Sequence, residues 1–231
     1  AAGDARSGAG GPSLTGLTGL IRVPTAELSG DQMARVSWTS AMRTSDMSMG
    51  ATSTRSLQLS VLPRTEASLS LGAYLGANGK DGWDLTLHLK AQVLEQKGWL
   101  PALAVGVVDL GRNGARDGTR FAVGTWTMDN GRICATIGGA DGTSSGLLAG
   151  LQWRPLPALE LQGEYDTHRT NWGMLVHVDR RTFVRGAILS TGTIVTVGHS
   201  FALNGPPEQV PLVAGERGVV RARSSLEEVR D

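Results

Sequence analysis

The chain has 231 residues, enough for one domain of moderate size. Its 22 basic and 21 acidic residues nearly cancel, so electrostatics gives no reason to expect nucleic acid or another polyanion as a partner. Cys134 is the only cysteine, which excludes an intramolecular disulfide and a thiolate metal cage. The sequence has no run of about 18 apolar residues and therefore no transmembrane helix.

The chain begins with an N-terminal arm, predicted over residues 1–32. It starts with Ala1 and not with Met, which indicates a processed N-terminus after a small-residue cleavage site. Its first dozen residues are rich in Gly, Ala and Ser and cannot bury a core, so we expect them to be flexible.

Alternation of apolar and polar residues is the dominant pattern after the arm. From Trp83 to Val93, every odd position is apolar and every even position is polar. Successive side chains of a strand point to opposite faces, so this segment predicts a strand with one apolar and one polar face. Segments 67–75 and 158–166 repeat the pattern, and helical spacing fits none of the three.

Weaker alternations extend the prediction to twelve strands. We place them at 33–40, 55–62, 66–75, 83–94, 101–110, 119–128, 131–139, 146–154, 158–166, 171–178, 182–189 and 193–202. The even-numbered connections are short, whereas the odd-numbered ones begin long and become shorter along the chain. Short turns on one side and longer loops on the other are typical of transmembrane barrels.

These features predict an all-β fold, an antiparallel up-and-down transmembrane β-barrel of about twelve strands spanning residues 33–203. Pro206 and Pro207 then open a polar stretch, so residues 204–231 are predicted to be a polar periplasmic tail. Within the tail, 224–230 has the composition of a short, marginal helix. The predicted location is the bacterial outer membrane.

Aromatic residues fall near both ends of the predicted strands. Amphipathic rings at the two ends of apolar strands match the aromatic girdles of membrane barrels. The alternative is that such rings close the ends of an ordinary core. The predicted membrane girdle consists of Trp38, Tyr74, Trp83, Trp99, Trp153, Tyr165, Trp172 and Phe201.

The polar faces of the strands would line the interior of such a barrel. An interior enclosed by about twelve strands is too wide for short side chains to close. Either a narrow aqueous path remains or a segment fills it, and Thr15 to Glu27 is a candidate plug. The polar residues predicted to face the lumen could form a structural network or line a selective pore. They are Asp84, His88, Lys90, Arg120, Arg154, Glu160 and Glu164.

Three segments of the chain carry a family resemblance. They are Gly16-Leu-Thr-Gly-Leu-Ile-Arg-Val-Pro-Thr-Ala26, the glycine-containing segment 100–111, and the strand–turn–strand segment 150–166, which ends in Glu-Tyr-Asp. These segments resemble the YjbH family of outer-membrane barrels associated with exopolysaccharide production, and the first is similar to the opening motif of that family. The resemblance covers residues 13–203 and implies a membrane barrel in a surface-polysaccharide context, shorter than many members. It supplies no catalytic residues.

The sequence offers little support for an enzyme, and we predict none and no cofactor or metal. His168 follows Asp166 in a predicted loop, where an outer-membrane hydrolase could place its catalytic groups, but no nucleophile elbow or metal-ligand spacing occurs. Another alternative is a soluble β-barrel that binds a small ligand or sugar. Predicted partners are outer-membrane lipids, envelope proteins that dock on the tail, and polysaccharide, but no nucleic acid.

Overall fold

The computed structural model describes residues 11–43, 51–75, 81–110, 118–142, 144–190 and 192–203. The predicted tail at 204–231 and the first ten residues of the predicted arm lie outside this part of the chain. No helix in the described ranges is long and apolar enough to cross a membrane.

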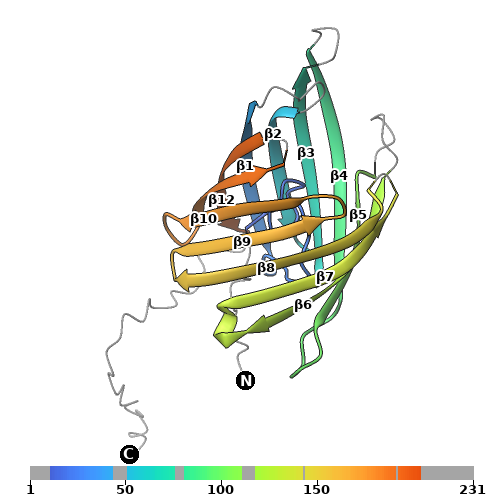
Figure 1. Ribbon diagram of the computed structural model, residues 1–231, viewed down its shortest axis with the longest axis vertical. Coiled ribbons are helices and arrows are strands. Elements are labelled where there is room, and N and C mark those ends of the chain that lie inside the picture. The colour runs from blue at the N-terminus through green and yellow to red at the C-terminus, as the bar shows by residue number, and fades with distance from the viewer. Residues whose placement is uncertain are drawn as a thin grey trace, which may run out of the picture.

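Twelve strands form in the described part of the chain, each overlapping a segment predicted from the alternation (Figure 1). A single 3-10 turn at Asp129–Gly131 connects two of them. The strands are β1 Met33–Arg43, β2 Ala51–Ser60, β3 Thr65–Leu75, β4 Asp81–Leu94, β5 Ala102–Val108, β6 Thr119–Met128, β7 Ile133–Asp141, β8 Gly146–Leu156, β9 Leu159–Asp166, β10 Thr170–His177, β11 Thr182–Leu189 and β12 Gly192–Ala202.

Each strand pairs antiparallel with its neighbour in the sequence, and β1 pairs with β12 to close the barrel. The closing register runs from Met33 opposite Ala202 to Arg43 opposite Gly192. Closure gives the backbone of every strand a partner on both sides, which a barrel needs in hydrocarbon. The prediction of an up-and-down antiparallel barrel of about twelve strands is confirmed.

The first connection is shorter than the sequence suggested. We expected residues 41–54 to connect the first two strands, but β1 continues to Arg43 and β2 begins at Ala51. The reason is pairing across the barrel seam, where Ala41, Met42 and Arg43 lie opposite residues of β12. Long-range pairing therefore extended a strand whose own sequence does not alternate clearly.

The barrel has its polar side chains inside and its apolar side chains outside. On β4, Leu85, Leu87 and Leu89 are 54%, 39% and 42% exposed, while His88 and Lys90 between them are buried. Most other strands repeat this arrangement with exposed Val, Leu, Ile and Trp side chains, whereas β6 and β11 also carry buried apolar side chains on the inner face. A water-soluble barrel would show the reverse, with its apolar face turned inward.

The segment before β1 lies inside the barrel. Figure 1 shows it as a dark blue chain within the ring of strands. Its apolar side chains Leu17, Leu20, Ile21 and Val23 are almost completely buried. Isolated bridges pair Pro12 with Thr18 and Gly19 with Pro24, so the segment folds back on itself. We call residues 11–32 the luminal segment.

Candidate functional site

The interface between the luminal segment and the inner wall is the candidate site, and an ion pair lies near its centre. Glu66 of β3 and Lys90 of β4 are 2.9 Å apart, and neither side chain is exposed. Glu66 also accepts hydrogen bonds from the backbone amide and the hydroxyl of Thr18, at 3.0 and 2.6 Å, and from the Ser29 amide. The carboxylate therefore links the wall to two separate positions of the segment.

Lys90 binds both halves of the luminal segment. Its ammonium group donates to the backbone carbonyls of Thr18, Thr25 and Glu27 at 2.9, 3.2 and 2.6 Å. Gln92, two residues along β4, donates to the carbonyl of Ala26 at 2.8 Å. A buried ammonium is stable only when its protons are satisfied, and here the segment supplies three of the acceptors.

Glu164 of β9 holds the apex of the luminal segment. Its carboxylate accepts from the consecutive backbone amides of Ile21, Arg22 and Val23 at distances between 2.9 and 3.0 Å. Asn171 of β10 adds a donor at 2.9 Å. Consecutive amides that converge on one carboxylate form an anion-binding nest, which is built here by the chain itself.

Apolar contacts fix the same segment on its other sides. Leu17, Leu20, Val23 and Ala26 pack against the inward side chains of β5, β6 and β8, and Ile21 packs against β11 and β12. Two inward glycines make room, because a Cβ at Gly150 would collide with Leu20 and one at Gly173 would lie 3.0 Å from Ile21. The wall residues in these contacts are Ala102, Ala104, Phe121, Val123, Leu148, Ala187, Leu189 and Ile194.

The segment enters and leaves at the short-turn side of the barrel. The carbonyl of Pro12 accepts a hydrogen bond from Arg185, near the start of β11, and the hydroxyls of Ser29 and Ser60 are 2.6 Å apart at the end of β2. The Arg22 side chain instead pairs with Asp166 at 2.9 Å, where β9 ends at the loop side. The luminal segment is thus a hairpin whose apex points toward the longer loops.

A polar region remains beside the segment, on the short-turn half of β8 to β11. Glu160 pairs there with Arg154 at 2.5 Å and with His177 at 2.7 Å. Among the described residues, buried side-chain atoms without a hydrogen-bond partner concentrate in this region. They include both amide atoms of Gln152 and of Gln162, which face each other across β8 and β9, and two guanidinium nitrogens of Arg185.

The structure places most of the predicted lumen set on the inner wall. Lys90 and Glu164 bind the luminal segment directly, as described above. His88 is buried and accepts from the amide of Asp109, and Asp84 is half-buried on the same face of β4. Arg154 and Glu160 form the ion pair of the short-turn half.

The prediction that Arg120 faces the lumen is wrong. Arg120 is exposed, and its neighbour Phe121 is the buried residue that points inward. On the loop-side half of β6 the inward residues Phe121 and Val123 are apolar, because the apolar side chains of the luminal segment pack on this part of the wall, whereas Thr125 farther along keeps a polar inward position. A strand that is apolar on its inner face cannot be oriented from its hydropathy alone.

Sequence reasoning did not single out four residues that matter here, one of which, Gln58, donates a hydrogen bond to the Thr18 hydroxyl at 3.0 Å. Glu66 and Gln58 lie on predicted polar faces, and their alternation was the available signal. Arg185 is fully buried, but Phe183 and Ala187 on the same inner face are apolar, so no alternation marked it. Glu27, the last residue of the candidate plug, accepts a hydrogen bond from Thr127.

The aromatic residues predicted as a girdle are exposed on the outer face or at its ends, apart from Tyr74, whose side chain lies outside the described part. Trp83, Tyr165 and Trp172 lie at the loop ends of their strands. Trp153 and Phe201 lie toward the short turns, and Trp99 lies in one of those turns. Trp38 is nearer the middle of β1, opposite Val197.

The two residues of the hydrolase alternative do not share a side-chain contact among those described. The His168 ring pairs with the hydroxyl of Thr167 at 2.6 Å. The carboxylate of Asp166 is engaged by Arg22 and by Asn171. Asp166 is therefore part of the contact with the luminal segment and does not orient His168.

Comparison with solved structures finds variants of the porin from Rh. blastica. Two of them have a TM-score of 0.34, with 12% and 11% sequence identity. The alignment covers 64% of this chain and 54% of the porin, so the chain spans about half the length of that protein. The comparison with curated proteins finds no match.

A family model described as "Exopolysaccharide biosynthesis protein YbjH" matches residues 13–144. The match covers more than half of the chain and includes most of the luminal segment and strands β1 to β7. Of the three segments with family resemblance, 16–26 and 100–111 fall inside the match and 150–166 falls outside it. The chain belongs to the YjbH family.

Proposed function

We propose that this protein is a plugged β-barrel of the bacterial outer membrane that serves as an anchor or scaffold in a surface-polysaccharide assembly. The observation that carries the proposal is the inverted barrel, apolar outside and polar inside, with the luminal segment bound to its inner wall. In the resting state the segment closes the lumen. Its displacement would open a narrow conduit.

Membrane residence is supported by the character of the outer face. Large apolar side chains are exposed on most strands, and the exposed Trp and Tyr side chains lie toward both ends. Exposure on this scale is not found on monomeric soluble proteins, which seldom present large contiguous apolar patches. Outer-membrane lipids are therefore the first partner that we propose. A soluble barrel with an internal apolar ligand site would need the opposite orientation.

The polysaccharide context comes from the family description, which names exopolysaccharide biosynthesis. The wall beside the luminal segment supports a polar path, because buried amide and guanidinium groups without protein partners cost about 1–3 kcal/mol each unless water or a polar ligand reaches them. Gln152, Gln162 and Arg185 would form one side of that path. We propose that the path is hydrated from the short-turn side and that Leu20 and Ile21 block its loop side.

A disulfide can test whether the luminal segment occupies the lumen in a membrane. The hydroxyls of Ser29 and Ser60 are 2.6 Å apart, so cysteines at both positions have suitable spacing. We expect S29C/S60C in a C134A background to form the bond in intact membranes, detected by mass spectrometry of peptides. S29C paired with S145C is the control, because Ser145 lies between β7 and β8 on the loop side, at the opposite end of the barrel. Absence of the bond in S29C/S60C would contradict the placement of the returning end of the luminal segment against β2.

The tail supplies a further partner proposal. Residues 204–231 contain Pro206 and Pro207 followed by a polar, charged stretch, which is unsuited to insertion into a membrane. With β12 ending at Ala202 on the short-turn side, the tail follows from the periplasmic face of a barrel in the usual orientation. We propose that it docks an envelope protein.

A further inference from the structure

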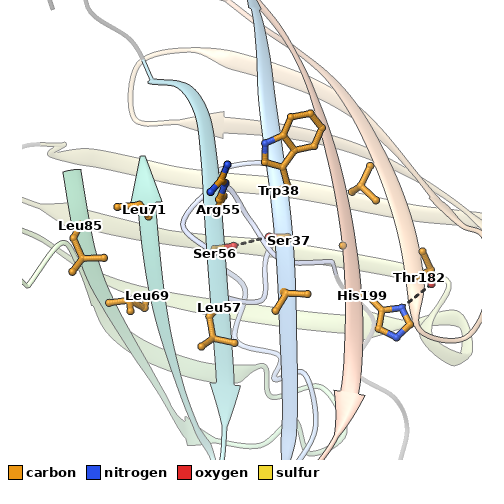
Figure 2. A pocket seen from close by; sticks show the side chains of 13 residues that line it. Ser37, Trp38, Arg55, Ser56, Leu57, Leu69, Leu71, Leu85, Thr182 and His199 are labelled. Atoms are coloured by element: carbon orange, nitrogen blue, oxygen red, sulfur yellow. Dashed lines mark hydrogen bonds between the residues drawn. The ribbon is translucent and has the colours of Figure 1, made fainter. Parts of the chain in front are cut away.

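A groove crosses the outer face of the barrel over β1 to β4 and reaches β11 and β12 (Figure 2). It is a shallow, open depression with a volume of about 880 Å³. Its walls are mostly apolar and come from Val36, Trp38, Leu57, Leu69, Leu71 and Leu85. Because the groove is on the outside of the barrel, its occupant must come from the surrounding membrane.

One cation lies in the groove. Arg55 of β2 is exposed, and its guanidinium carbon is 5.9 Å from the centre of the Trp83 ring, which fits a cation–π contact. Figure 2 shows it beside Trp38, above the apolar side chains of Leu57 and Leu69. Among the described residues no carboxylate forms an ion pair with Arg55, although the chain pairs other arginines such as Arg22 and Arg154.

Arg55 is the fifth of the ten residues of β2 and lies opposite Trp38, but its guanidinium reaches toward the loop end, where it contacts the Trp83 ring. Trp83 is the third residue of β4, which begins at the loop end, and an amphipathic Trp ring favours the interface. An outward arginine is strongly disfavoured at mid-membrane but tolerated near the interface. Below it, the apolar wall continues toward the short-turn side and ends at the hydrogen-bonded pair Thr182 and His199, 2.9 Å apart.

We propose that the groove binds a phosphorylated glycolipid of the outer leaflet. Arg55 holds a phosphate, because a planar guanidinium donates two parallel hydrogen bonds to such a group. An acyl chain lies along Val36, Leu57 and Leu69. The proposal rests on the proposed membrane location, since the longer loops of such barrels face the exterior and place Arg55 in the outer leaflet.

Native mass spectrometry of the detergent-solubilised full chain can measure this binding, with bis-phosphorylated lipid A as the probe. We expect Arg55→Gln to weaken retention about tenfold, the loss expected when a charge-assisted pair of hydrogen bonds is removed. Arg120→Gln is the matched control, because Arg120 is also exposed near the loop end but lies on β6, away from the groove. Leu69→Trp should fill the groove and weaken retention while Arg55 is intact.

Measurements with different probes distinguish a lipid phosphate from free inorganic phosphate. Wild-type protein should bind dephosphorylated lipid A as weakly as the Arg55→Gln variant binds the phosphorylated form, and inorganic phosphate should not compete. Equal loss in the Arg55→Gln and Arg120→Gln variants would overturn the proposal. Binding of phosphatidylethanolamine as strong as that of lipid A would also overturn it. A second copy of the chain retained in the groove in place of lipid would overturn it as well.

Folding is checked by heat-modifiable migration on gels for every variant. A wild-type chain that lacks this behaviour and extracts without detergent contradicts the proposed membrane function itself. A chain that is inserted and heat-modifiable but shows no preference for phosphorylated glycolipid contradicts the groove assignment alone.

Discussion

Glu66 and Lys90 face each other inside the barrel at 2.9 Å, and together they make contact with four residues of the luminal segment. A buried pair of this kind is weak support for stability by itself, because removing two charges from water is costly. Here both charges also bind backbone groups of the luminal segment, in addition to the backbone hydrogen bonds that the segment forms within itself. The pair is thus best understood as the attachment of the segment to the wall.

Breaking this pair should loosen the segment. Lys90→Met leaves an uncompensated buried carboxylate, so we expect unfolding to become easier by about 3–5 kcal/mol. Glu66→Gln/Lys90→Met should recover a large part of that loss, which a double-mutant cycle in urea can measure. The control is Arg64→Met, because Arg64 and Glu95 form an exposed pair that contributes about 0–1 kcal/mol. Equal effects of Lys90→Met and Arg64→Met would contradict the attachment role.

Removal of the Glu164 carboxylate should release the apex of the hairpin. Glu164→Ala takes the acceptor from the amides of Ile21, Arg22 and Val23. We expect trypsin to cleave after Arg22 at least several times faster, measured by the appearance of the new fragment over time. Asp166→Asn removes the charge that pairs with the half-exposed Arg22 and alters the hydrogen bond from Asn171, but leaves the Glu164 nest intact, so we expect it to change the cleavage rate little. A rate that does not respond to Glu164→Ala would mean that the nest does not hold the segment.

The outward face can be tested by the depth dependence of a charge. Leu87→Arg should destabilise the barrel in lipid bilayers. The free energy of unfolding should fall by about 2–4 kcal/mol if Leu87 lies near the membrane centre. Leu62→Arg, in the short turn after β2, should change it by about 1 kcal/mol or less, since charges near the interface cost little. In a soluble protein both substitutions are at exposed positions and would have similarly small effects.

Deletion of residues 204–231 should leave the barrel intact and remove its protein partner. The closing strand β12 ends at Ala202, before the deletion begins. We expect unchanged heat-modifiable migration together with loss of the proteins that co-purify with the full chain after cross-linking. Replacement of the same residues by a Gly/Ser stretch of equal length is the control for length. Co-purification that survives both changes would place the docking surface elsewhere.

The sequence predicted the barrel well because period-two alternation is a local property. Strand β4 shows this most clearly, since its apolar and polar residues alternate without exception from Trp83 to Val93. The short even-numbered connections then indicated that consecutive strands are neighbours in the barrel, because adjacent antiparallel strands require only short connections. Thr15 to Glu27 was named as a candidate plug, because twelve strands leave an interior too wide to close and this stretch precedes the first strand, but an open aqueous path was the alternative.

The contacts inside the lumen could not be predicted in the same way. Arg120 was placed on the wrong face because the inner side of β6 is apolar where Leu20 and Val23 pack. Arg185 was missed because its strand has an apolar inner face as well. Both errors arise from tertiary contacts with a segment more than 90 residues away in the sequence, and hydropathy along a single strand carries no information about them.

Ion conductance across a planar bilayer tests the central claim most directly. Wild-type protein should show no steady open channel, because the luminal segment fills the barrel. A variant without residues 1–30 should give a stable, ohmic conductance, and Gly150→Leu, which puts a side chain where Leu20 packs, should raise the frequency of openings. Heat-modifiable migration confirms that each variant is folded. Identical conductance in the wild-type protein and in both variants would contradict a barrel closed by its own N-terminal segment.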